Sequence, residues 1–185
     1  AVHMSQGQIV DQAAGNAMNK TAISFDDASP FHSGLQLCDA NYVALSPLSF
    51  LPKAAATHPD RMAIIYGDLH RSWREIYVRC RRFASALKKR GIAPGDTVAI
   101  IAPNIPAMYE AHFAVPMAGA VLNTLNTRLD AEAIAFQLNH GEARILLVDC
   151  EFSEVILRAL DMVSNPPTVI DIADVLYDGP VKRIG

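Results

Sequence analysis

Residues 97–124 read TVAIIAPNIPAMYEAHFAVPMAGAVLNT. The run Val98–Ala102 is continuously apolar, which is typical of a strand buried on both faces. Asn104 and a proline at the first helical position then open a predicted helix over about Pro106–Met117. Ala120–Asn123 reads as a second strand. A strand, a helix and a strand in this order predict a parallel pair with a right-handed crossover.

The same alternation continues toward the C-terminus. It predicts a helix Ala131–His140 between a capping Asp130 and Gly141, a strand Arg144–Val148, a helix over about Phe152–Val163 and a strand Thr168–Ile172. Strands that alternate with helices of this length indicate an α/β fold of three layers, with a mainly parallel sheet and helices on both faces.

Before this unit the sequence predicts a helix and a β-hairpin. Ser46-Pro47 combines a favoured cap with a proline at the first helical position, and that helix runs to about Thr57. Met62–Tyr66 and Leu69–Ser72 then read as two short strands. The Gly67-Asp68 pair between them predicts a tight hairpin turn.

A long amphipathic helix follows the hairpin. The sequence Ser72-Trp73-Arg74-Glu75 is a capping box, in which Ser and Glu satisfy exposed amides reciprocally. Apolar residues then recur at helical spacing as Ile76, Cys80, Phe83 and Leu87. Gly91 is predicted to end the helix after Arg90, with Ile92 making the hydrophobic contact of a C-cap.

The composition describes a globular chain. Of 185 residues, 51% are apolar and 19% charged, which excludes disorder of the whole chain and fits one domain, or one domain plus a tail. The longest nearly apolar stretch, Phe113–Leu122, is interrupted by Pro116 and is shorter than the roughly 20 residues of a membrane span. The net charge of −3 gives no reason to expect a nucleic-acid partner.

The first 40 residues differ from the rest. They hold four Asp and one Lys, which accounts for the whole net charge, whereas residues 41–185 hold 15 basic and 15 acidic side chains. We expect residues 1–40 to be an extended arm with a short helical turn at Ile9–Ala14. Ala1-Val2-His3 looks like an addition made during cloning, with Met4 as the native start. Residues 41–185 form the predicted α/β body.

The cysteines are widely spaced and odd in number. Cys38, Cys80 and Cys150 form no CxxC pair, so neither a zinc site nor a disulfide framework is indicated. No charged start followed by an apolar run predicts secretion. A reduced, cytosolic setting is therefore expected.

Several features allow a functional and a structural interpretation. A run of basic residues could bind nucleic acid, but we prefer to interpret it as a solvated helix face. The run comprises Arg71, Arg74, Arg79, Arg81, Arg82, Lys88, Lys89 and Arg90. Trp73 and Tyr77 are interpreted as packing anchors. Met108, Phe113 and Met117 are interpreted as core residues, with an apolar ligand pocket as the alternative, and His112 as packed or capping.

Three stretches resemble the N-terminal region of acyl-CoA synthetases, members of the adenylate-forming enzyme superfamily. Arg71–Ile76 (RSWREI) resembles the first core motif of that superfamily. Val98–Asn104 (VAIIAPN) resembles the strand after its Pro-Gly-Asp turn, and Pro116–Asn126 (PMAGAVLNTLN) resembles its second core motif. The resemblance covers Asn41 to about Asp174. At the end of the third stretch, residues 123–129 (NTLNTRL) are most similar to the branch acting on short- and medium-chain fatty acids and related small carboxylic acids.

The resemblance implies a two-step reaction. ATP and a carboxylate form an acyl-adenylate and pyrophosphate, and the thiol of CoA then displaces AMP, with Mg²⁺ neutralising phosphate charge. The phosphate loop, the nucleotide-binding residues and the catalytic lysine come later in the chains of that family. No catalytic, cofactor-binding or metal-binding residue is therefore assigned here, and the acyl substrate stays open.

The expected role is thus that of an N-terminal part, truncated within the loop Tyr177–Gly185 and inactive by itself. The resemblance implies ATP, Mg and CoA as cofactors and substrates of the full-length enzyme, which would act in fatty acid metabolism. It implies no cofactor for this part alone. Its expected partners are the remainder of the ligase chain and further copies of itself. The alternatives are a non-enzymatic oligomerisation or interaction module and, from topology alone, a flavodoxin-like nucleotide binder. A reading frame that continues into a Ser/Thr/Gly-rich loop would favour the ligase.

Overall fold

A computed structural model describes residues 46–185. The predicted arm, with its helical turn at 9–14, lies outside the described residues, as does Cys38. The division into an arm over 1–40 and a body over 41–185 stays a prediction.

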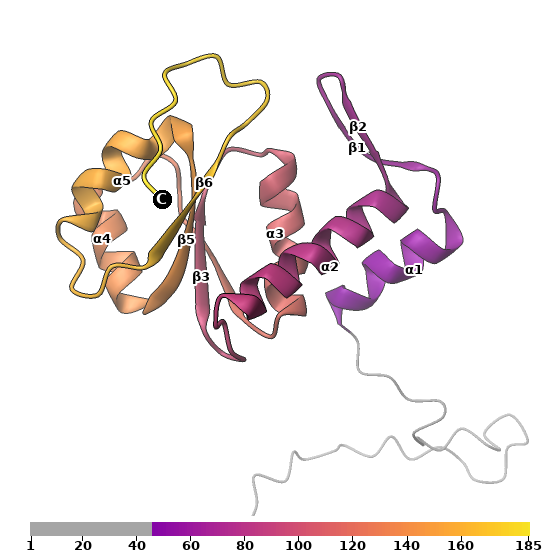
Figure 1. The fold of residues 1–185 in the computed structure, drawn as a ribbon, viewed down its shortest axis with the longest axis horizontal. Coiled ribbons are helices and arrows are strands. Elements are labelled where there is room, and N and C mark those ends of the chain that lie inside the picture. Colours follow the sequence, from indigo (N-terminus) through magenta and orange to yellow (C-terminus); the bar gives the residue numbers. More distant parts are fainter. Residues whose placement is uncertain (1–45) are drawn as a thin grey trace, which may run out of the picture. The chain divides into compact units, whose positions relative to one another are not determined.

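The helices and strands follow one another in the predicted order (Figure 1). The elements are η2 (Pro47–Ser49), α1 (Phe50–Thr57), β1 (Met62–Tyr66), β2 (Leu69–Ser72), α2 (Trp73–Lys89), β3 (Thr97–Ile101), α3 (Pro106–Met117), β4 (Val121–Thr124), α4 (Ala131–His140), β5 (Ala143–Asp149), η3 (Cys150–Phe152), α5 (Ser153–Leu160) and β6 (Thr168–Ile172). β1 and β2 pair as an antiparallel hairpin.

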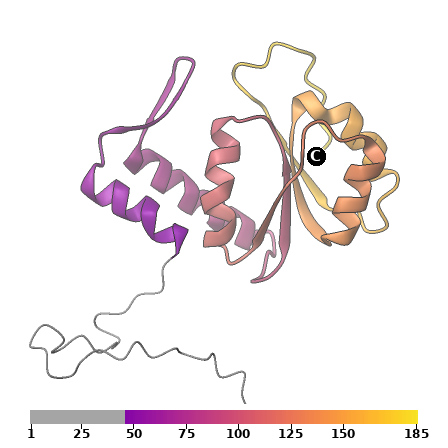
Figure 2. The same cartoon turned by 180° about the vertical axis from the view of Figure 1, so that it is seen from behind.

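The other four strands form one parallel sheet in the order β4-β3-β5-β6. Helices α2 and α3 cover one face and α4 and α5 the other, as both views show (Figures 1 and 2). The structure thereby confirms the predicted three-layered α/β fold with a preceding hairpin.

β3 divides its side chains between two cores. Val98 and Ile100 pack with buried residues of α2 and α3, and Ala99 and Ile101 with those of α4 and α5. All four are fully buried. This is the double burial that the continuous apolar run predicts for a parallel strand.

Local hydrogen bonds fix both ends of α2. The Glu75 amide donates to Ser72 Oγ at 3.3 Å and the Ser72 amide donates to Glu75 Oε2 at 2.7 Å, which confirms the capping box. At the other end Gly91 has a φ of +83°, its amide donates to the Lys88 carbonyl and the Ile92 amide donates to the Leu87 carbonyl. This is a Schellman motif, which stops the helix at the predicted place.

Gly119 makes the turn from α3 into β4 in the same way. Its φ is +85°, its amide donates to the carbonyl of Pro116, and the Ala120 amide donates to that of Val115. The positive φ explains why a glycine stands in the stretch that resembles the second core motif.

The structure corrects three local predictions. The first helix starts as the 3₁₀ turn η2 before α1. Asn104 does not cap α3, because Ile105 is the N-cap and no described side chain makes a capping hydrogen bond there. The predicted helix 152–163 is shorter, since Asp149 caps the 3₁₀ turn η3 first and α5 ends at Leu160.

Candidate functional site

The connections of the sheet single out one edge as the place for a ligand. From β3 the chain crosses through α3 to β4 on one side, whereas α4 and α5 carry it to β5 and β6 on the other. Chains that leave neighbouring strands toward opposite faces open a crevice at the carboxyl ends of those strands. Here the two connections diverge between β3 and β5, so the expected place is their carboxyl ends, where Ala102-Pro103-Asn104 follow β3 and Asp149 is the last residue of β5.

Asp149 is the most unusual residue of this edge. It is fully buried, its Oδ1 accepts a hydrogen bond from the Glu151 amide at 3.0 Å, and its Oδ2 has no hydrogen-bond partner among the described residues. Burial raises the pKa of Asp149, and the nearby carboxylates of Asp174 and Glu151 raise it further, against the lowering effect of the Glu151 amide.

Asp174 links the edge to the hairpin. The phenol of Tyr66 on β1 donates to Asp174 Oδ2 at 2.6 Å. This hydrogen bond, together with burial and the charges of Asp174, Asp149 and Glu151, raises the pKa of Tyr66 to about 12. Tyr66, Asp149, Glu151 and Asp174 therefore form one electrostatically connected group from four parts of the chain.

Residues 173–185, here called the strap, loop over the carboxyl ends of the strands after β6 (Figure 1). Besides Asp174, the strap is held by Leu176, which packs over Gly67 of the hairpin turn. Farther along, the Lys182 carbonyl lies 2.6 Å from Ser153 Oγ, and the Ile184 amide donates to Asp171.

The carboxyl edge does not fit the phosphates of ATP. Phosphate binding needs oriented amides or fixed cations, whereas this edge gathers three carboxylates, and the Glu151 amide already donates to Asp149. Nor do the described residues include a group of three His, Cys, Asp or Glu side chains arranged to hold a metal ion.

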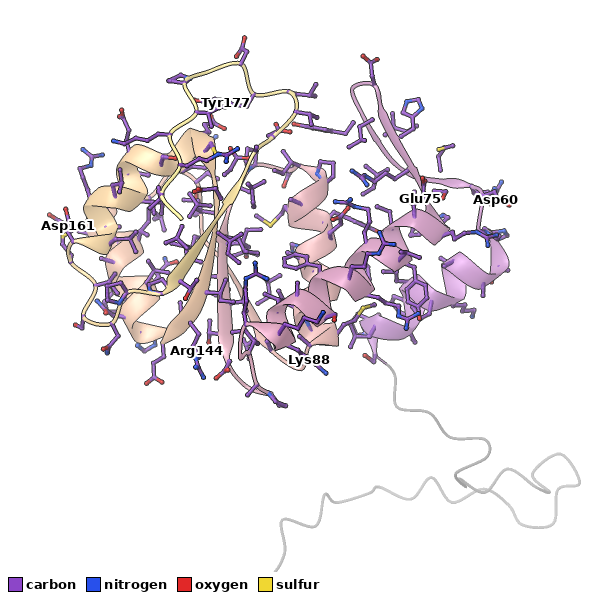
Figure 3. All side chains as sticks on the ribbon, viewed as in Figure 1. Asp60, Glu75, Lys88, Arg144, Asp161 and Tyr177 are labelled. Carbon is purple, nitrogen blue, oxygen red and sulfur yellow. The ribbon has the colours of Figure 1, made fainter. Side chains whose placement is uncertain are left out.

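A hollow of about 800 Å³ lies at the opposite, amino edge of the sheet. Figure 3 shows Arg144 at that edge and Tyr177 of the strap at the other. The polar groups lining the hollow bind one another. Arg144 pairs with Asp96 at 3.2 Å, and Asn139 Oδ1 accepts from the Ser164 amide. Hydrogen bonds from the Ala93 amide and Arg144 lower the pKa of Asp96. We assign these groups to holding the loops together.

A groove of about 380 Å³ lies where α2 and α3 leave part of the sheet uncovered. Its apolar lining includes Phe83, Leu147, Ile170 and Ile172. At its rim Arg79 forms a two-bonded ion pair with Glu110, which is 4% exposed.

The basic run of α2 is mostly a solvated face, as expected. Arg74, Arg81, Arg82, Lys88, Lys89 and Arg90 are exposed. Two members depart from that interpretation: Arg79 is engaged with buried Glu110, and Arg71 is half-buried with an enclosed Nε.

The aromatic and sulfur-containing candidates pack as the structural interpretation predicts. Met108 and Met117 contact the core beneath α2 and α3, whereas Trp73, Tyr77 and Phe113 contact a smaller core shared with α1. His112 is exposed rather than packed, with its Nδ1 2.8 Å from the Met108 carbonyl in its own helix. Cys80 and Cys150 are buried, and neither forms a disulfide with another described residue. None of the helices in the described part is both long and apolar enough to cross a membrane.

Sequence reasoning missed the acidic group at the carboxyl edge. Asp149 can be recognised in the sequence as the charged residue that ends the apolar run ARILLVD. Tyr66 and Asp174, however, are 108 positions apart, and only the fold brings them into hydrogen-bond contact. The sequence also contained no sign that Glu110 is buried, because the spacing of apolar residues in α3 does not show which face Glu110 occupies.

Comparison with known proteins identifies a matching family and several similar sequences. Residues 51–182 match the family model described as AMP-binding enzyme. An acetate/butyrate–CoA ligase of Arabidopsis thaliana, described as peroxisomal, is 60% identical over 113 residues, which is 61% of this chain and 20% of that protein. An acetate–CoA ligase of Humulus lupulus is 51% identical over 142 residues, 73% of this chain and 25% of that protein. The chain thus spans about a fifth to a quarter of the length of these relatives.

Solved structures give the same picture. A putative long-chain-fatty-acid CoA ligase from Rhodopseudomonas palustris is 29% identical, with a TM-score of 0.65 over 74% of this chain and 34% of that one. An O-succinylbenzoate coenzyme A synthetase from Bacillus subtilis, in complex with ATP and magnesium ion, is 30% identical, with a TM-score of 0.56 over 65% of this chain and 32% of that one.

Proposed function

Because the chain belongs to the AMP-binding enzyme family, we propose that it is the N-terminal part of an AMP-forming CoA ligase that acts on a short-chain carboxylic acid. One observation carries the substrate class: the 60% identity over 113 residues to a ligase named for acetate and butyrate. In the proposed reaction the carboxylate attacks ATP, releasing pyrophosphate and forming an acyl-adenylate. The CoA thiol then attacks the acyl carbon, and AMP leaves.

The described residues contribute a scaffold to this reaction. Their parallel sheet is buried on both faces and ends in an acidic edge that does not fit nucleotide phosphates. We therefore place the ATP-binding, Mg²⁺-binding and CoA-binding residues in the remainder of the ligase. The expected cytosolic location stays a prediction, because several relatives carry the word peroxisomal in their names.

The test uses the full-length protein with ATP, Mg²⁺ and CoA. Acetate, butyrate, benzoate and a long-chain fatty acid are compared by pyrophosphate release and by consumption of the CoA thiol. We expect the highest kcat/KM for acetate or butyrate. A preference for benzoate or the long-chain acid would overturn the substrate class, and no pyrophosphate release with any acid would overturn the activity.

A further inference from the structure

Among the described residues, none of the groups that influence the pKa of Asp149 is a cation. The negative charge of the acidic group at the carboxyl edge is therefore not balanced there. The groups that face Asp149 are Glu151 of η3, Asp174 of the strap and the phenol of Tyr66 on β1. Arg183 of the strap acts instead on the neighbouring Cys150. Burial raises the pKa of that thiol, and Arg183 opposes the rise.

An ionised Asp149 would be poorly accommodated. The side chain is fully buried, and from the described part of the chain its Oδ1 accepts one hydrogen bond and its Oδ2 none. A buried carboxylate without partners for its charge is strongly unfavourable, and here two more carboxylates lie near it. A protonated Asp149 avoids both the buried charge and the repulsion.

We propose that Asp149 is protonated while the strap lies over the carboxyl edge, and that its ionisation releases the strap from the β1–β2 hairpin. On ionisation the proton passes to solvent, and the new negative charge repels Asp174. Asp149 itself is fixed, because β5 is paired on both sides and Asp149 caps η3. Asp174 lies in a segment without helix or strand, so the strap is the part that moves.

The direction of the pH dependence follows from linkage. The pKa of Asp149 is raised in the strap-closed state, so that state binds more protons than the released state. The closed state is therefore favoured at low pH and loses stability as the pH rises above the ordinary Asp value of about 3.9. Release uncovers the edge at which open α/β sheets bind ligands. The inference is independent of the proposed ligase activity.

The test follows two NMR signals of the 185-residue chain from about pH 4 to about pH 9, a range that brackets a raised carboxyl titration. They are the side-chain carboxyl carbon of Asp149 and the methyl groups of Leu176, which pack over Gly67 when the strap is closed. We expect Asp149 to titrate above the ordinary Asp value of about 3.9, and the Leu176 methyl shifts to change with the same midpoint. Asp161, an exposed Asp outside the acidic group (labelled in Figure 3), supplies the control variant.

Three variants complete the test. In Asp149→Asn the Leu176 shifts should stay at their closed position over the whole range. Asp174→Asn keeps an acceptor for the Tyr66 phenol but removes the negative charge. The midpoint of the Asp149 titration should therefore fall, and the change in the Leu176 shifts should become smaller. This variant gives a result even if Asp149→Asn fails to fold. Asp161→Asn is the matched control and should change neither signal. Titration of Asp149 at the ordinary Asp value of about 3.9, or an unchanged Leu176 response in either test variant, would overturn the proposal.

Discussion

The Arg79–Glu110 pair joins α2 to α3 at the rim of the uncovered groove. Arg79 Nη2 donates to Glu110 Oε2 at 3.0 Å and its Nε donates to Oε1 at 2.5 Å, while the two side chains are 43% and 6% exposed. Because the Glu110 side chain is almost enclosed, its carboxylate depends on Arg79 for its two hydrogen bonds from described residues. The pair therefore fixes how the two helices meet rather than supplying a solvated charge.

Removal of the arginine should reveal that dependence. We expect Arg79→Met to lower the free energy of unfolding by about 2 kcal/mol, less than the 3–5 kcal/mol typical of breaking a fully buried pair, because Arg79 is half-exposed. The double variant Arg79→Met/Glu110→Met should recover most of the loss. Urea unfolding measures both, with exposed Arg82→Met as the control. Equal effects of the two arginine variants would contradict this role.

At the level of elements, α2 is defined by its own termini. The capping box and the Schellman motif satisfy backbone groups that would otherwise lack partners at the two ends of the helix. Such signals depend on neighbouring residues only, and they are independent of how the sheet assembles.

Loss of the cap should weaken the fold measurably. We expect Ser72→Ala to lower the free energy of unfolding by about 1 kcal/mol, because Ser72 Oγ no longer accepts from the Glu75 amide. Ser85→Ala, an exposed serine in the middle of the same helix, is the matched control and should not destabilise. Indistinguishable melting temperatures of Ser72→Ala and the wild type would remove the cap assignment.

The same cap should respond to acid. Hydrogen bonds from the Ser72 backbone and side chain lower the pKa of Glu75. A lowered pKa in the folded state contributes stability that is present above the unfolded value of about 4.3 and lost as the pH falls through the folded value. We expect melting temperatures below about pH 4.3 to fall more steeply in the wild type than in Glu75→Gln. Identical slopes would show that Glu75 does not contribute.

The sequence predicted features that depend on neighbouring residues, such as helix caps. It did not predict contacts between residues that only the fold brings together. Alternating strands and helices predicted the parallel sheet, but not that β5 lies between β3 and β6. The end of α4 shows the limit at one residue. Gly141 stands there as predicted, yet its φ is an ordinary −84°, and Glu142 adopts the positive φ of 47°. The acidic edge was missed because burial and neighbours, rather than residue types, make Asp149 unusual.

For the molecule as a whole, the uncovered groove and the sheet edges should promote self-association. Phe83, Ile170 and Ile172 line the groove where α2 and α3 leave part of the sheet uncovered. In addition, β4 and β6 are the edge strands of the parallel sheet. Apolar hollows and open edges both favour pairing. We expect oligomers in sedimentation velocity at roughly tens of micromolar, and fewer of them in Ile170→Lys. A monomer at that concentration would contradict the expectation.

The 185-residue chain alone should neither bind ATP tightly nor make acyl-CoA. Its acidic edge repels phosphate, and a transferring group needs stabilisation in a water-excluded site, which we do not expect this α/β unit to enclose by itself. Calorimetry should therefore detect no ATP binding at submillimolar concentrations, and no acid-dependent pyrophosphate release should occur. Turnover by the purified chain, lost on substitution within residues 46–185, would require an active site other than the one proposed.

The position of β3 inside the sheet also has a consequence for synthesis on the ribosome. β3 and β4 can pair as soon as β4 has been made, directly after α3, but the other side of β3 waits for β5, which begins at Ala143. At roughly 5–20 residues per second, the roughly 40 residues from Ile101 to Ala143 take about 2–8 s to appear. Throughout this interval the nascent chain presents an apolar strand with an unpaired side. That interval is when a chaperone on the emerging polypeptide would protect this protein most.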